Sequence, residues 1–136
     1  MIRLVDLLHE SAISFRETEK ERDEDGLVFV EYRFRVGETT YRVEISSMDT
    51  PGYFEASFGV HGGDFNKIDT FELTGEGRAQ TILHTVAEIL NKFYSRYKAE
   101  VEAIEIAGTS EKRSRIYKNF LPRYLSSDVS KVVIFK

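Results

Sequence analysis

The chain contains no cysteine among its 136 residues. Disulfides, thiolate nucleophiles and cysteine-ligated zinc are therefore excluded, and the composition fits a reducing compartment. No apolar run approaches the roughly 20 residues of a membrane span, so we expect no membrane association. Residues 1–10 are too short for a secretory signal and include Asp6.

An excess of basic charge is also missing. The chain has 19 Lys and Arg against 23 Asp and Glu, a net charge of −4. A general nucleic-acid binder normally has a basic face, so we expect no nucleic-acid partner. The histidines, His9, His61 and His84, show no metal-ligand spacing, so we expect no metal site. With 41% hydrophobic residues and no internal repeat, the chain is long enough for one domain with a core of its own.

Alternating apolar residues predict strands in the first half of the chain. The clearest alternation spans residues 27–36, and shorter ones follow at 41–45, 54–60 and 67–73. Gly37-Glu38 and Pro51-Gly52 separate the first three as turn signals. We therefore expect an antiparallel meander.

The segments before this meander are less regular. Residues 12–18 form a possible edge strand, and the almost wholly charged residues 17–25 predict a solvated loop. Residues 1–10 carry an apolar stripe at helical spacing. They are either a short N-terminal helix docked on the domain or a leader, and residues 11–136 form the single domain.

The second half predicts helices between strands. From about residue 78 to 98, apolar residues recur every three or four positions, with His84, Glu88 and Asn91 among the polar residues facing away. A short apolar run at 101–107 predicts a strand. A second helix follows, with Ser110 as its cap and Pro122 near its end, and residues 131–135 read as a last strand. The fold class is therefore α+β: a meander, then helix–strand–helix–strand, forming a mixed sheet with two helices packed on it.

The junction between the two halves, residues 72–79, has the features of a ligand site. Gly75 and Gly77 allow close approach to the backbone. The helix starting near Arg78 offers unpaired N–H groups and a positive dipole end to an anion such as a phosphate. The alternative is a strand-to-helix turn that needs two glycines for its geometry alone.

This order of elements resembles the GNAT N-acetyltransferases. In that family a Gln/Arg-x-x-Gly-x-Gly/Ala loop leads into a helix that holds the pyrophosphate of acetyl-CoA. The matching sequence here is Glu72-Leu73-Thr74-Gly75-Glu76-Gly77, which departs from the pattern at Glu72. Residues 114–120 are similar to the family's second helix, and Tyr117 occupies the position of the tyrosine that often serves as general acid in that family. The Gly-Phe that follows in the family is absent, as are the helices between its first two strands.

A second resemblance concerns the N-terminus. Leu8-His9-Glu10 is similar to the end of the short head-targeting leaders on internal proteins of tailed phages, which are cut after a glutamate. This resemblance implies a phage protein that is located in the host cytoplasm or packaged in the virion.

The resemblances leave two functions open. The first is a non-catalytic binding or accessory protein that acts through a protein partner. The exposed meander edge and the aromatic residues Tyr53, Phe54 and Phe65 are candidate contacts, and no cofactor is expected. The second is an acetyl-CoA-dependent N-acyltransferase. Its pyrophosphate loop is Gly75, Gly77 and Arg78, its general acid is Tyr117, and either Glu44 or Glu55 is the base.

Overall fold

The computed structural model describes residues 12–62, 78–106 and 111–136. Within these residues one sheet has six strands in sequence order: β1 (Phe15–Asp23), β2 (Gly26–Val36), β3 (Thr39–Ser47), β4 (Tyr53–Val60), β5 (Ala103–Ile106) and β6 (Val133–Phe135). Neighbours from β1 to β4 are antiparallel, whereas β4, β5 and β6 are parallel. The helices are α3 (Arg78–Tyr97), α4 (Glu111–Phe120) and α5 (Ser127–Ser130), with 3-10 turns η2 (Lys98–Glu100) and η3 (Leu121–Arg123). The expected α+β class with a mixed sheet is confirmed, with α5 as an additional short helix.

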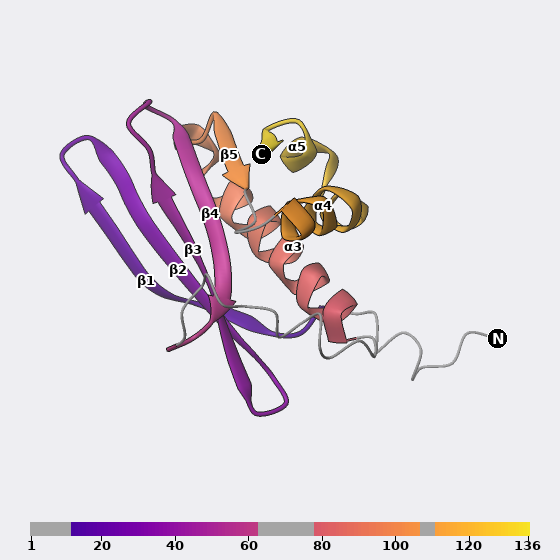
Figure 1. Ribbon diagram of the computed structural model, residues 1–136. Helices are drawn as coiled ribbons and strands as arrows, with labels where there is room; N and C mark the ends of the chain where they lie inside the picture. The colour runs from indigo at the N-terminus through magenta and orange to yellow at the C-terminus, as the bar shows by residue number, and fades with distance from the viewer. Residues whose placement is uncertain (1–11, 63–77, 107–110) are drawn as a thin grey trace.

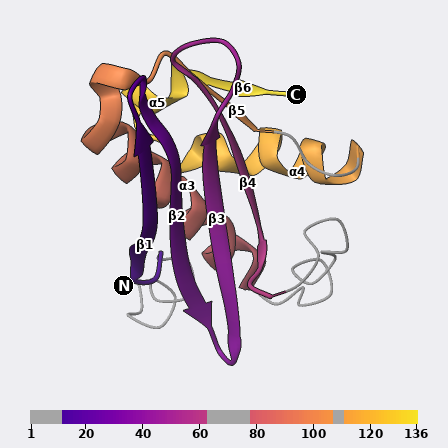
Figure 2. The same ribbon diagram turned by 90° about the vertical axis from the view of Figure 1, so that its left-hand side faces the viewer.

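All three helices lie on the same side of the sheet. Figure 1 shows α3, α4 and α5 to the right of the strands. Figure 2, turned by 90°, shows β1 to β4 in front with the helices behind them. We call the helix side the covered face and the other side the uncovered face, because no described element lies on it.

The core lies between the covered face and α3. Alternate residues of β2, β3 and β4 point into it, and one stripe of α3 meets them. The largest of these fully buried residues are Tyr32, Ile45, Ile82, Ile89, Leu90 and Phe93. The predicted periods of two for the strands and 3.6 for the helix therefore describe the buried surfaces correctly.

The turn between β2 and β3 shows why the hairpin forms at Gly37. Val36 pairs with Thr39, so only Gly37 and Glu38 connect the strands. Gly37 has a φ of 61° at the first central position, which type II′ turns require and glycine adopts without strain.

The expectation of a solvated loop at residues 17–25 is wrong. β1 runs from Phe15 to Asp23 and pairs with β2 as far as Asp23 opposite Gly26. The backbone of β1 forms hydrogen bonds with β2, while most of the charged side chains of β1 are exposed to water. The high charge content therefore does not prevent strand formation. The register shifts between Glu17 and Glu19 and between Glu21 and Arg22. Such irregularities and charges are typical of an edge strand.

The C-terminal segment contains more secondary structure than predicted, namely η3 and α5. Ser126 caps α5 through a hydrogen bond from the N–H of Val129 to its hydroxyl oxygen, at 3.2 Å. Pro122 lies within η3, directly after α4, as expected for a residue that ends a helix. Ser110 and the strand expected at residues 67–73 lie outside the described residues.

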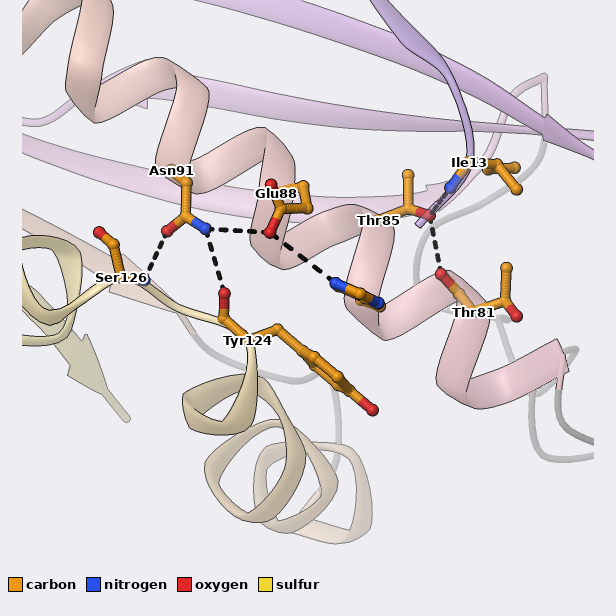
Figure 3. Close-up of polar contacts among 8 residues, drawn as sticks. Ile13, Thr81, Thr85, Glu88, Asn91, Tyr124 and Ser126 are labelled. Atoms are coloured by element: carbon orange, nitrogen blue, oxygen red, sulfur yellow. Dashed lines mark hydrogen bonds and ion pairs between the residues drawn. The ribbon is translucent and has the colours of Figure 1, made fainter. Parts of the chain in front are cut away.

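Figure 3 shows the hydrogen bonds by which α3 contacts Ile13 and the segment at Tyr124 and Ser126. The side-chain amide of Asn91 donates to the carbonyl of Tyr124 at 3.1 Å and accepts from the N–H of Ser126 at 2.9 Å. Near the start of the helix, Thr85 accepts from the N–H of Ile13 at 3.0 Å. These polar contacts connect α3 to the start of the described chain and to the segment that precedes α5.

Candidate functional site

The expected acyl-CoA loop lies only partly within the described residues. α3 begins at Arg78, as the sequence predicts. Gly75 and Gly77 lie outside the described residues, so the phosphate cradle stays a prediction.

Tyr117 lies on the buried side of α4. It is 4% exposed, and its ring centre is 5.4 Å from that of Phe58 on β4. The guanidinium of Arg113, one turn earlier, lies 5.9 Å from the same Phe58 ring. The cavity beside Tyr117 measures about 10 Å³, which is about the volume that one water needs. In the described structure Tyr117 therefore packs in the core beneath α4.

The candidate bases Glu44 and Glu55 do not meet Tyr117. Both alternate along their strands with core residues, Val43 and Ile45 around Glu44 and Phe54 and Ala56 around Glu55. Their side chains therefore lie on the uncovered face, whereas α4 packs on the covered face. The sheet separates the expected acid from both expected bases.

The aromatic contacts expected for a partner are also placed differently. Phe54 is buried in the core with its ring 5.5 Å from that of Phe93, so the expectation that it meets a partner is wrong. Tyr53 is half-buried, and Phe65 lies outside the described residues.

The uncovered face carries a row of arginines that runs across three strands. Arg16 on β1 is opposite Arg33 on β2, and Arg33 is opposite Arg42 on β3. We call these three residues the arginine row. Directly opposite residues have Cβ atoms about 5 Å apart, and like charges at that spacing destabilise a sheet.

Carboxylates two residues away on the same strands offset part of this repulsion. Glu31 Oε2 accepts from Arg33 Nε at 2.9 Å, and Glu44 Oε2 lies 3.2 Å from Arg42 Nε as an ion pair without hydrogen-bond geometry. Arg16 is exposed, and its side chain makes no hydrogen bond or ion pair with the described part of the chain.

Glu31 is a charged residue that is almost fully buried on this face, at 3% exposure. Burial by itself raises the pKa of its carboxyl. The hydrogen bonds donated by Thr18 and Arg33, and the charges of Arg33 and Arg42, act in the other direction and leave the pKa below its usual value. Glu31 is therefore ionised at neutral pH and holds Arg33 in place.

An open recess of about 530 Å³ lies at one end of the arginine row. We call it the basic recess, and its lining residues are Ser14, Phe15, Arg16, Arg33, Phe34, Arg35, Thr40 and His61. None of them is acidic. Arg35 donates from Nε to the carbonyl of Gly37 at 2.8 Å, which directs its guanidinium without neutralising it. Clustered guanidinium groups of this kind bind oxyanions through paired charge-assisted hydrogen bonds.

The other end of the sheet has the opposite charge. A recess of about 790 Å³ there includes Asp23, Asp25, Asp49 and Glu100 in its lining. Glu100 accepts two hydrogen bonds from Arg22, both at 3.0 Å, and one from the N–H of Leu27. The hydrogen bonds from Arg22 are the main cause that lowers the pKa of Glu100. Through these hydrogen bonds the Glu100 carboxylate connects η2 to the β1–β2 hairpin. Among the described residues, no group of acidic or histidine side chains has the geometry of a metal site.

The sequence reveals only part of this site. Its period of two places Arg33 and Arg35 on one face of β2. Arg16 lies in the possible edge strand predicted at residues 12–18, but its alignment with Arg33 depends on the register of β1 against β2, which the sequence does not give.

Comparisons with known proteins identify the family. Residues 17–135 match the family of unknown function DUF6934, and the chain belongs to it. No curated protein and no solved structure matches the chain. None of the described helices is long and apolar enough to cross a membrane.

Proposed function

We propose that this DUF6934 member is a non-catalytic binding protein on a GNAT-like scaffold, acting through a protein partner that docks on the uncovered face. The arginine row is the observation that carries this proposal. Aligned like charges cost folding stability, and a cost of this kind is typical of a trade-off between stability and function. Electrostatic complementarity then gives the interaction its specificity and its rate of association.

The partner meets the face of the sheet and not its β1 edge. A partner strand adding to an edge needs a regular row of free backbone groups. β1 interrupts that row with two register shifts and surrounds it with charged side chains. These features block strand addition, whereas the uncovered face presents its side chains across the strands.

The binding proposal is tested by site-directed photo-crosslinking in cells that naturally produce the protein. A photoreactive residue replaces Glu55, exposed on the uncovered face, or Lys118, exposed on α4. We expect a discrete protein adduct from position 55 and none from position 118. Adducts from position 118 alone, or from neither position, would contradict the proposal.

A phage origin is part of the proposal, with the protein acting in the host cytoplasm or carried in the virion. The leader-like end of residues 1–10 supports it. Cleavage after Glu10 would leave Ser11 as the first residue. N-terminal mass spectrometry of the protein from infected cells and from purified particles tests this, and an intact Met1 in both samples contradicts a cleaved leader.

The alternative function is an acetyl-CoA-dependent N-acyltransferase. The start of α3 at Arg78, directly after Gly75 and Gly77, supports it. The burial of Tyr117 and its separation from Glu44 and Glu55 favour the binding proposal instead. Calorimetric titration with acetyl-CoA distinguishes the two. The binding proposal predicts no micromolar affinity and no rise in melting temperature, and micromolar binding that Gly77→Trp abolishes would support the enzyme.

A further inference from the structure

We infer that the basic recess binds an acidic, extended segment of a protein, in which carboxylates alternate with other residues. This inference rests on the proposed function, because it specifies the chemistry of the partner. It concerns the end of the uncovered face lined by Arg16, Arg33, Arg35, Thr40 and His61.

The spacing of the arginines fits such a segment. Arg33 and Arg35 are two residues apart on β2, so their Cα atoms lie about 6.6 Å apart and their side chains share one face. Residues i and i+2 of an extended peptide have the same spacing. Two alternating carboxylates of the segment therefore lie over two guanidinium groups. Arg16, about 5 Å to the side of Arg33, reaches the same carboxylate or the next one.

The guanidinium groups of the recess still have donors to offer. The side chain of Arg16 makes no hydrogen bond or ion pair with the described residues, and within them Arg35 uses only Nε, on the carbonyl of Gly37. A guanidinium carries five N–H donors, and carboxylates bind it bidentately. Thr40 is held at the recess by its carbonyl, which accepts from the N–H of His61 at 2.8 Å, and its hydroxyl adds a neutral donor.

Charge on the rest of the face favours a short acidic segment over a nucleic acid. Beyond the recess the uncovered face carries the exposed carboxylate of Glu55 and the carboxylates of Glu44 and Glu105, which pair with Arg42 and Lys136. A phosphate backbone that continued across the face would meet these negative charges. A protein segment with its acidic residues confined to a few positions avoids them and pairs only with the recess.

The test is fluorescence polarisation with two synthetic probes. One is a labelled peptide of alternating Glu and Ser, and the other is its Gln and Ser counterpart. The full-length protein is compared with the double variant Arg16→Gln/Arg35→Gln. The matched control is Arg115→Gln/Arg123→Gln, which removes the same charge from exposed arginines of α4 and η3.

We expect the Glu probe to bind at least about tenfold more tightly than the Gln probe, with an affinity that falls as salt rises. The recess variant should weaken binding of the Glu probe by about tenfold or more, and the control by less than about twofold. Equal losses in both variants would overturn the inference, since they would reflect net charge alone. Tighter binding of a DNA oligonucleotide with the same dependence on Arg16 and Arg35 would also overturn it.

The crosslinking experiment separates this inference from the proposed function. If the adduct at position 55 forms equally well in the recess variant and the Glu probe does not bind, the recess inference fails and the binding function stands. If the Glu probe binds through the recess but no adduct forms at position 55, the proposed protein partner does not cover the middle of the uncovered face, and the recess remains an acidic-peptide site.

Discussion

The two faces of the sheet are built by the same strands and differ in how completely their charges are paired. On the covered face, Glu17 accepts from the Tyr97 hydroxyl at 2.7 Å and from Arg96 at 3.1 Å, so its carboxylate is matched within the fold. On the uncovered face, Arg16 lies opposite Arg33 and has no carboxylate partner among the described residues. The charges of the covered face are therefore matched within the fold, whereas on the uncovered face Arg33 and Arg42 have carboxylate partners and Arg16 adds positive charge beside them.

On the covered face, the Tyr97 hydroxyl is kept protonated by its surroundings. Burial raises the pKa of Tyr97 to about 12, and the hydrogen bond to Glu17 adds to the shift. The phenol therefore stays protonated and keeps donating across the ordinary pH range. This chain can pair its charges within the fold, so Arg16, whose side chain has no ion pair among the described residues and lies opposite Arg33, is a feature to explain by binding.

The largest test of the contrast removes a core side chain. Phe93 on α3 is fully buried against Phe54, so Phe93→Ala leaves a cavity and should lower the free energy of unfolding by about 3–5 kcal/mol. Glu55→Ala on the uncovered face should change it by no more than about 0.5 kcal/mol. Urea denaturation measures both, and similar losses in the two variants would remove the distinction between the faces.

The next effect concerns the contacts that α3 makes with the C-terminal segment. Asn91→Ala leaves the Tyr124 carbonyl and the Ser126 N–H without their protein partner, and should cost about 1–2 kcal/mol. Hydrogen exchange at the Ser126 amide should accelerate as well. Lys92→Ala, at an exposed neighbouring position, is the control and should change neither quantity.

The next prediction concerns the pH dependence of stability, through Glu31 on the uncovered face. Because its pKa is lowered in the folded protein, ionised Glu31 stabilises the fold above its unfolded pKa of about 4.5, and the stabilisation is lost as pH falls through the folded pKa. Glu31→Gln should cost about 1 kcal/mol at pH 7. The difference in unfolding free energy from the native protein should shrink steadily below about pH 4.5. A difference that stayed constant to low pH would show that the carboxyl titrates as in the unfolded chain.

The smallest effect has the opposite sign. Arg16→Gln relieves repulsion by Arg33, so it should raise stability by about 0.2–0.5 kcal/mol at low salt. This gain should disappear at about 1 M salt, where charges are screened within ~3 Å. Thermal denaturation at both salt concentrations provides the measurement. A loss of stability in Arg16→Gln would mean that the arginine serves the fold and not a partner.

The sequence predicts the strongly periodic elements well. α3 and strands β2 to β4 were recognised because each buries a face whose repeat is visible within a single segment. The possible edge strand at residues 12–18 covers only the start of β1, and the loop prediction for residues 17–25 is wrong because the charged part of an edge strand has no buried face to produce such a repeat. The polar side of α3 was expected to face water. Instead Asn91 binds the C-terminal segment, and the ring of His84 stacks on Tyr124 with centroids 4.1 Å apart.

By itself, then, the sequence determined the class of fold, the buried stripe of α3 and the side of β2 on which Arg33 and Arg35 lie. The tertiary structure alone decided that Arg16, Arg33 and Arg42 form one row, that Tyr117 packs in the core, and that Glu44 and Glu55 lie across the sheet from it. The physical reason is that periodicity records which way a side chain points along its own element. Which side chains meet across the sheet depends on strand register and helix placement, which arise from contacts between residues distant in sequence.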